Sequence, residues 1–159
     1  MKMKIVPIRA DFIHKTRNAG LDDQNQPVVR SIAVGGEPCR DVLRRARPGE
    51  EILLASYCPF SVPGPYKEYG AVFLLANEPE QQPDYSRFPL PTGSDTDYLG
   101  ETLVLRAYNS SEQIVDAHVT TPAEAEAMLG ELFANLEVTF VLTRFVAYGC
   151  YGFRIERDL

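Results

Sequence analysis

The longest run of β-branched and aromatic residues in the chain covers positions 137–157. Residues of these types are enriched in strands, and a glycine on each side of the segment around Cys150 supplies the backbone freedom that a tight connection requires. The pattern predicts a β-hairpin with a five-residue loop, 148–152, that carries Cys150 at its tip. With this loop, we expect Arg144 to pair with Glu156 across the hairpin.

A second hairpin is predicted by the clean alternation of apolar and polar positions over 102–108 and 114–119. The polar segment 109–113 lies between them and reads as the turn. A register that keeps the apolar residues of both strands on one face places Arg106 opposite Asp116 on the other face.

The segment 121–136 combines a helix start signal with a helical apolar stripe. Thr121, Pro122 and Glu124 form the pattern of a capping box with proline at the first helical position. The apolar residues that follow share one side of a helix: Ala125, Met128, Leu129, Leu132 and Phe133. Because the segment stands between the two hairpins, we expect a helix that crosses over one face of the sheet.

The first half of the chain carries weaker patterns. Strands are predicted at 4–9, 28–34, 51–57 and 71–76. A proline at the start and three apolar residues on one side predict a helix over 38–46. The proline-rich segment 77–100 has little periodicity, and both a functional loop and a plain excursion remain open for it.

These elements predict an α+β fold: a mainly antiparallel sheet of about six strands with two helices packed on it, one of them a crossover helix. The chain has 159 residues, which is within the usual size of a domain with one hydrophobic core, so we expect a single domain over 1–159. Hydrophobic residues make up 45 % and charged residues 24 %, which excludes wholesale disorder and a coiled coil.

The chain is acidic, with a formal net charge of −6 at pH 7 and a sequence pI of about 4.9. Nucleic acids and anionic membrane surfaces bind cationic faces, so neither is expected as a main partner. The one local group of basic residues is in 40–47. No apolar run has the length of a membrane span and positions 1–7 lack the apolar segment of a signal peptide, so we expect a cytoplasmic protein.

Cys39, Cys58 and Cys150 are an odd number of cysteines without C-x-x-C spacing, so free thiols are expected. Cys39 falls in the first turn of the predicted helix beside Arg40, where the helix dipole and the positive charge favour a thiolate. It is a candidate catalytic nucleophile, and the alternative is a buried cysteine that packs the helix onto the sheet. Cys150 is the second candidate, because its loop could bring it to Cys39 as a redox pair.

Four residues of the second hairpin form a candidate ligand-binding face. Arg106, Tyr108, Asp116 and His118 would offer a cation, a phenol, a carboxylate and an imidazole to one small ligand. The alternative is an ordinary Arg–Asp pair on a solvated sheet face.

Arg144 interrupts an apolar strand and therefore needs a partner. Glu156 would satisfy it structurally, and a ligand carboxylate or phosphate would satisfy it functionally. Arg40 and Tyr66 complete the candidate ligand-binding set, and Tyr66 belongs to a proline and aromatic loop, 59–69, that either lines the floor of a pocket or is simply rigid.

No cofactor motif is present in the sequence. The two histidines, His14 and His118, and the scattered cysteines have no metal-ligand spacing. Glycine-rich phosphate loops, the nucleophile elbow and the zincin helix are also missing from the sequence. We expect neither a metal nor another cofactor.

Short strings in a fixed order connect the chain to a known family. They are Pro38-Cys39-Arg40, Pro48-Gly49-Glu50, Pro65-Tyr66, 70–73, 103–108, 115–117, and Gly149-Cys150-Tyr151 followed by 154–157. Together they resemble a family of uncharacterised bacterial proteins, domain-of-unknown-function family 1203. The resemblance implies a single-domain architecture and no known activity. Leu142, Arg144 and Phe145 stand where the family often has histidine or asparagine, so a histidine-dependent activity is not expected in this member.

Three functions are compatible with these patterns. The first is a binding module for a small polar or anionic ligand, with its pocket over the face of Arg106, Asp116 and His118. The second is a thiol-dependent enzyme or redox sensor that uses Cys39 with Cys150. The third is a homo-oligomer that pairs an exposed strand edge with a second copy. Whether the protein is an enzyme stays open at this stage.

Overall fold

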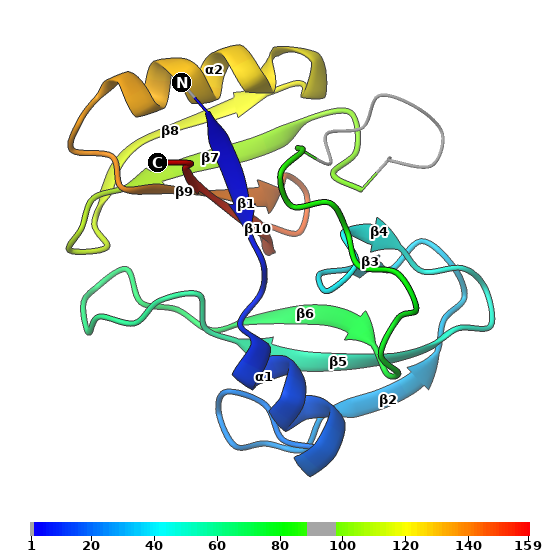
Figure 1. Ribbon diagram of the computed structural model, residues 1–159. Coiled ribbons are helices and arrows are strands. Elements are labelled where there is room, and N and C mark those ends of the chain that lie inside the picture. Colours follow the sequence, from blue (N-terminus) through cyan, green and yellow to red (C-terminus); the bar gives the residue numbers. More distant parts are fainter. Residues whose placement is uncertain (1, 89–97) are drawn as a thin grey trace.

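The computed structural model describes residues 2–88 and 98–159, and within them the strands form two five-stranded sheets (Figure 1). The first sheet has the order β1-β10-β9-β7-β8 and is antiparallel throughout. Its strands are β1 (Met3–Val6), β7 (Leu103–Tyr108), β8 (Ile114–Thr120), β9 (Phe140–Phe145) and β10 (Tyr151–Arg157).

The second sheet has the order β2-β5-β6-β3-β4. Its strands are β2 (Val29–Ile32), β3 (Pro38–Cys39), β4 (Arg44–Arg45), β5 (Glu51–Tyr57) and β6 (Gly70–Leu75). All neighbouring pairs are antiparallel except β3 and β6, which are parallel. The α+β class is therefore confirmed, but the prediction of one sheet of about six strands is wrong.

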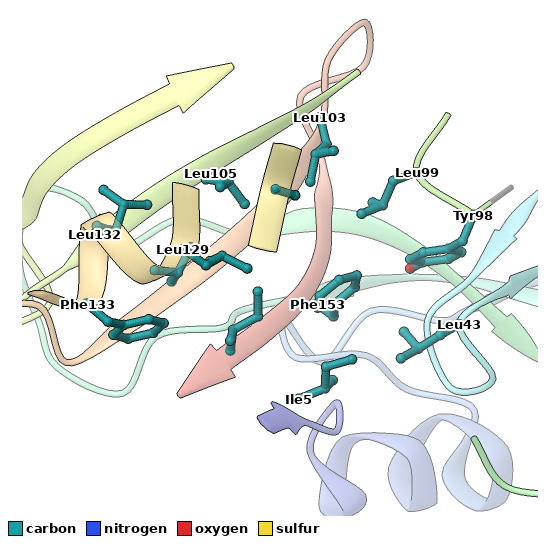
Figure 2. Close-up of a cluster of buried hydrophobic side chains, with 14 of the residues drawn as sticks. Ile5, Leu43, Tyr98, Leu99, Leu103, Leu105, Leu129, Leu132, Phe133 and Phe153 are labelled. Carbon is teal, nitrogen blue, oxygen red and sulfur yellow. The ribbon is translucent and has the colours of Figure 1, made fainter. Parts of the chain in front are cut away.

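Helix α2 (Pro122–Ala134) is the predicted crossover. It joins β8 to β9, which both run antiparallel to β7 and hence parallel to each other. Its buried residues enter a cluster with the Leu105 face of the first sheet, and Figure 2 shows Leu129, Leu132 and Phe133 beside Leu105 and Phe153. Proline does stand at the helix start, but the Thr121 side chain makes no capping hydrogen bond, so the expected capping box is not formed.

The other face of the first sheet packs on the second sheet. Tyr108, Phe140 and Leu142 share one buried cluster with Leu53 of β5 and Leu74 of β6. A short second helix, α1 (Ala10–His14), continues into a π-helical turn, η1 (Lys15–Ala19). Phe12 of α1 joins the same cluster, and its ring contacts the Tyr57 ring with 4.6 Å between centroids. The first sheet is thus a central layer, with α2 on one side and the second sheet on the other (Figure 1).

The helix predicted over 38–46 is wrong. Its residues form a tight hairpin, β3 and β4, whose turn contains Leu43 with a φ of +51°. Three apolar residues are too few to define a helical stripe, and a helix of nine residues is marginal without tertiary support. Here the tertiary contacts favour a strand, because Cys39 pairs with Phe73 of β6.

The register predicted for the β7–β8 hairpin is wrong by one residue. Arg106 pairs with Ala117, and Asp116 pairs with Ala107. An irregularity between Ala107 and Tyr108 causes the shift, because one extra residue in a strand reverses which side chains share a face. Arg106 therefore faces the second sheet, while Asp116 faces the α2 side.

The β9–β10 hairpin exists, but its loop is 146–150 and not 148–152. Tyr151 pairs with Arg144 and Glu156 pairs with Phe140, so Arg144 and Glu156 are not partners. Gly152 lies inside β10, where an added Cβ would come within 2.4 Å of Thr143 Oγ1. Close packing leaves no room for a side chain at this position. In the sequence, a glycine required for this reason looks the same as a glycine in a turn.

The long proline-rich segment is only partly described, since residues 89–97 lie outside the described residues. Its two ends pack on the core. The Tyr85 hydroxyl donates a hydrogen bond to the carbonyl of Asp41 at 3.1 Å, and the Tyr98 hydroxyl donates one to the carbonyl of Gly152 at 2.9 Å. In the part of the chain that is described, no helix is both long and apolar enough to cross a membrane.

Candidate functional site

A cleft of about 780 Å³ lies where the edge of the second sheet meets the β9–β10 loop. Five segments border it: the connection into β3, the β3–β4 hairpin, β5 at Leu54, the start of β6 with the residues before it, and the end of β9 with the loop after it. We call it the arginine cleft, because Arg40, Arg45 and Arg144 all line it. Its carboxylates are Glu37 and Glu68, so the lining has a net positive charge in a chain whose net charge is −6.

Arg40 anchors the cleft at its base and is 2 % exposed. Its Nε donates to the carbonyl of Tyr151 at 2.8 Å, and its Nη1 donates to the carbonyl of Pro38 at 2.6 Å. Its Nη2 donates to the sulfur of Cys150 at 3.1 Å. The guanidinium also lies 5.0 Å from the centre of the Phe145 ring. Arg40 thus links the β3–β4 hairpin to β10. Its guanidinium hydrogen-bond donors bind groups of the protein itself.

Arg144 is 6 % exposed and less well satisfied than Arg40. Its Nη1 donates to the carbonyl of Gly149 at 3.1 Å, and its Nη2 forms an ion pair with Glu68 Oε1. Its Nε is buried and has no hydrogen-bond partner among the described residues. A buried donor on a charged group that lacks a partner carries a desolvation cost, so this atom marks a place where an acceptor would stabilise the protein.

Glu68 is shared between two arginines. Besides Arg144, its Oε1 lies 3.8 Å from Nη1 of Arg106. The Glu68 side chain is 47 % exposed, whereas that of Arg144 is 7 % exposed. One solvent-accessible carboxylate therefore serves two guanidinium groups, and positive charge is in excess on this side of the cleft.

The third arginine, Arg45, lies in β4 and also contacts Phe145. Its guanidinium is 5.8 Å from the ring centre, and its Nη1 donates to the carbonyl of Gly36 at 2.7 Å. Its neighbour Arg44 forms two bonds to Glu50, at 2.8 and 2.9 Å, which lower the pKa of Glu50 to about 2. Within the basic group at 40–47, Arg40 and Arg45 thus line the cleft, whereas Arg44 is paired with Glu50.

The three cysteines have different surroundings. Cys39 is fully buried in β3, and desolvation followed by the charge of Asp41 raises its pKa to about 12. The predicted helix dipole is missing there, so the reason given for a reactive Cys39 does not apply. Cys58 is also buried and its thiol contacts the carbonyl of Phe60 at 3.5 Å. Cys150 is partly exposed and lines the arginine cleft.

Asp116 and His118 do not share a sheet face with Arg106, so the prediction that the three residues form one ligand-binding face is wrong. They form a pair on β8, the edge strand, with 3.1 Å between Asp116 Oδ2 and His118 Nε2. This hydrogen bond lowers the pKa of Asp116. Asp116 and His118 thus belong to the α2 side of the sheet, away from Arg106.

Tyr108 and Tyr66 contribute to neither side of the cleft. Tyr108 is 1 % exposed and stacks on Phe140 with 5.0 Å between ring centres, so it is part of the core. Tyr66 is 43 % exposed in the proline loop. Of the predicted ligand-binding residues, Arg40 and Arg144 line the cleft, and Arg106 contacts its Glu68 carboxylate.

A second cleft of about 550 Å³ is lined by Pro59, Phe60 and Tyr69 of the proline loop together with two arginines. Arg9 is paired with Asp23 at 2.5 Å. Arg154 is paired with Glu156 at 2.7 Å and lies 3.7 Å from the centre of the Phe140 ring. Because these arginines are already paired with carboxylates, this cleft is a weaker candidate for an anion.

Arg45, Glu68 and Phe145 belong to the site but were not among its predicted residues. Arg45 had a signal in the basic group at 40–47. No feature of the sequence pointed to Glu68, since a single glutamate in a proline-rich loop is common. Within residues 2–88 and 98–159, no group of three or more His, Cys, Asp and Glu side chains is placed to hold a metal ion.

Comparison with known proteins adds one result. The family described as "Protein of unknown function (DUF1203)" matches residues 36–157, which include β3, β4 and the β9–β10 hairpin. No curated protein and no solved structure matches the chain.

Proposed function

The chain belongs to the DUF1203 family of proteins of unknown function, and we propose that this member binds a small organic anion in the arginine cleft. The observation that carries the proposal is Arg144, which is 6 % exposed and has a buried Nε without a hydrogen-bond partner among the described residues. A planar guanidinium matches a carboxylate or a phosphate with two parallel hydrogen bonds, and such charge-assisted bonds are the strong ones.

The lining of the cleft indicates what else the anion carries. Leu54, Phe73, Phe145 and Tyr148 provide apolar and aromatic surface beside the arginines. Sites for small molecules usually combine such surface with a few placed polar groups, and a volume of about 780 Å³ is within their range. An anion with an aromatic or branched apolar body uses both parts of the lining.

Glu68 has the role of an internal counter-ion in this proposal. It neutralises Arg144 while the cleft is empty, and its exposed position lets it move into solvent when a ligand carboxylate or phosphate takes its place. Releasing Glu68 also leaves Arg106 free to attract the incoming charge. Ligand affinity is therefore reduced by the competition with Glu68.

Calorimetric titration with phenyl phosphate and benzoate tests the proposal, with benzyl alcohol as the neutral counterpart. We expect the anions to bind and the alcohol not to bind. Arg144→Gln should weaken binding about tenfold or more, since a hydrogen bond to a charged group contributes about 1.5–3 kcal/mol. Glu68→Gln should tighten binding, because it removes the competing carboxylate.

Arg30→Gln is the matched control. Arg30 lies in β2, pairs with Glu51 at 2.5 Å, and is outside the cleft. Equal affinities in the Arg144→Gln and Arg30→Gln proteins would contradict the proposal, as would a Glu68→Gln protein that binds no better than the parent. Far-ultraviolet circular dichroism of each variant separates lost binding from lost folding.

A further inference from the structure

Cys150 is the cysteine that the fold places in the arginine cleft. Its side chain is partly exposed, and its sulfur accepts a hydrogen bond from Arg40 Nη2 at 3.1 Å. The guanidinium cannot move away easily, because its other nitrogens are bonded to the carbonyls of Tyr151 and Pro38. The sulfur is therefore accessible and lies against a fixed positive charge, two features of the surroundings in which reactive cysteines are found.

Arg144 provides an independent observation at the same place. Its Nη1 donates to the carbonyl of Gly149, the residue directly before Cys150. Its Nε, on a side chain that is 7 % exposed, has no hydrogen-bond partner among the described residues. A cation that can bind an anionic group is therefore held on the backbone of the residue before Cys150.

The other two thiols do not have this combination. Cys39 is 0 % exposed and Cys58 is 6 % exposed. Cys39 Sγ is directed to the carbonyl of Glu37 at 3.6 Å, and neither thiol lines the arginine cleft. Any reaction that needs access and a neighbouring cation is thus restricted to Cys150.

We propose that Cys150 exchanges with low-molecular-weight disulfides that carry carboxylates and forms a mixed disulfide with them. The proposal rests on the proposed function, because the arginines that bind a small anion are the groups that hold the carboxylate while the sulfur reacts. The substrate class of the cleft is then small disulfides with carboxylate groups. The occupancy of the cleft depends on the concentrations of small thiols and disulfides around the protein.

The exchange is balanced without any other oxidant. The Cys150 thiolate attacks one sulfur of the small disulfide, a new S–S bond forms to Cys150, and the original S–S bond breaks. The electron pair of the broken bond leaves with the second sulfur, which takes up a proton and departs as a thiol. Cys150 is oxidised to the disulfide level and half of the small disulfide is reduced. A second small thiol reverses the reaction.

The test compares three disulfides at equal concentration: glutathione disulfide, which is anionic, bis(2-hydroxyethyl) disulfide, which is neutral, and cystamine, which is cationic. Intact-mass spectrometry follows the initial rate of adduct formation on the reduced full-length protein. The synthetic peptide of residues 147–152 serves as the reference, so that the intrinsic reactivity of each disulfide cancels in the ratio of protein rate to peptide rate.

We expect one adduct per chain, located on Cys150 by peptide mapping and missing in Cys150→Ser. The ratio of protein rate to peptide rate should be about tenfold higher for glutathione disulfide than for the neutral disulfide, a size typical of electrostatic attraction in a charged cleft. Arg144→Gln should remove most of this preference and Arg30→Gln should keep it. Phenyl phosphate should slow the reaction with glutathione disulfide.

Two results would overturn the inference: an adduct located on Cys39 or Cys58, or equal ratios for the three disulfides. Calorimetry with phenyl phosphate on the same protein separates this outcome from a failure of the proposed function. Phenyl phosphate binding without a preferred disulfide refutes the exchange alone. No anion binding together with no charge preference refutes both.

Discussion

The guanidinium of Arg40 donates a hydrogen bond to the sulfur of Cys150 across 110 positions of sequence. The same side chain bonds the backbone of Pro38 and of Tyr151. Two of the strings that carry the family resemblance, Pro38-Cys39-Arg40 and Gly149-Cys150-Tyr151, are therefore in direct contact. This contact closes the base of the arginine cleft and joins the second sheet to the first.

Replacing Arg40 by methionine should destabilise the protein strongly. Methionine retains much of the length of the side chain but leaves the carbonyls of Pro38 and Tyr151 without their donor, and an unsatisfied buried acceptor costs about 1–3 kcal/mol. We expect the free energy of unfolding in urea to fall by about 3 kcal/mol. Arg30→Met, at an exposed surface ion pair, should lower it by less than about 1 kcal/mol. Equal losses in the two variants would show that Arg40 is not a structural tie.

Replacing Gly152 by alanine should disrupt the β9–β10 hairpin. The new methyl group would lie 2.4 Å from Thr143 Oγ1 and 3.3 Å from the Thr143 carbonyl oxygen. Thr143 Oγ1 cannot simply move aside, because it accepts a hydrogen bond from the Phe153 amide at 2.9 Å. Overpacking of this kind costs about 1–3 kcal/mol, which thermal unfolding measures as a lower midpoint.

Gly130→Ala is the control for that substitution. Gly130 lies within α2, and a Cβ there meets no atom within 4 Å. Alanine is favoured over glycine in a helix by about 1 kcal/mol, so this variant should be more stable than the parent. A loss of stability at Gly130 equal to that at Gly152 would argue against steric crowding as the cause.

The Arg44–Glu50 pair predicts a pH dependence of stability. The pKa of Glu50 is lowered from 4.5 to about 2, first by the hydrogen bonds from Arg44. A carboxyl whose pKa is lower in the folded state stabilises the protein fully above pH 4.5, and this contribution is lost as the pH falls toward 2. The pair is partly exposed, so we expect a contribution of about 1 kcal/mol.

Unfolding of the Glu50→Gln variant by urea at several pH values measures that contribution. The difference from the parent should be constant above pH 4.5 and should shrink as the pH falls toward 2. A difference that stays constant over the whole range would show that Glu50 acts by packing and not by its charge.

The edge of the second sheet makes the homo-oligomer hypothesis testable. Among the described strands β2 pairs only with β5, and it exposes Val29 by 57 % and Ile32 by 63 %. An unpaired edge with apolar side chains favours pairing with a second copy. We expect light scattering to give a dimer mass and Ile32→Lys to reduce it toward the monomer mass. A monomer mass for the parent protein at high concentration would reject this hypothesis.

Local patterns in the sequence were sufficient for the class of the fold. The stripe at 121–136 and the alternation at 102–108 and 114–119 predicted α2 and the β7–β8 hairpin, and both are present. These patterns succeed because the period of apolar residues reports which side of one element is buried, and that information lies within one element. The same reasoning failed for 38–46, where few apolar residues left the choice to distant contacts.

Registers and the site depended on features that no local pattern contains. One irregular residue near Tyr108 placed Arg106 and Asp116 on different faces, and a β9–β10 loop two residues earlier than predicted separated Arg144 from Glu156. The sequence marked Arg144 because it interrupts an apolar strand, Cys150 because glycines flank it in a predicted loop, and Arg40 because it lies beside Cys39. It did not indicate that Glu68 would neutralise Arg144.

The sequence by itself thus determined the α+β class, the crossover helix, the two hairpins and the chemical types available for a site. Only the tertiary structure decided that the strands divide into two packed sheets, that Cys39 is buried, and that Arg40 contacts Cys150 while Arg144 contacts the neighbouring Gly149. The physical reason is that the burial pattern of an element depends on its own residues, whereas a cleft depends on which distant elements pack together. That packing is determined by the whole core at once.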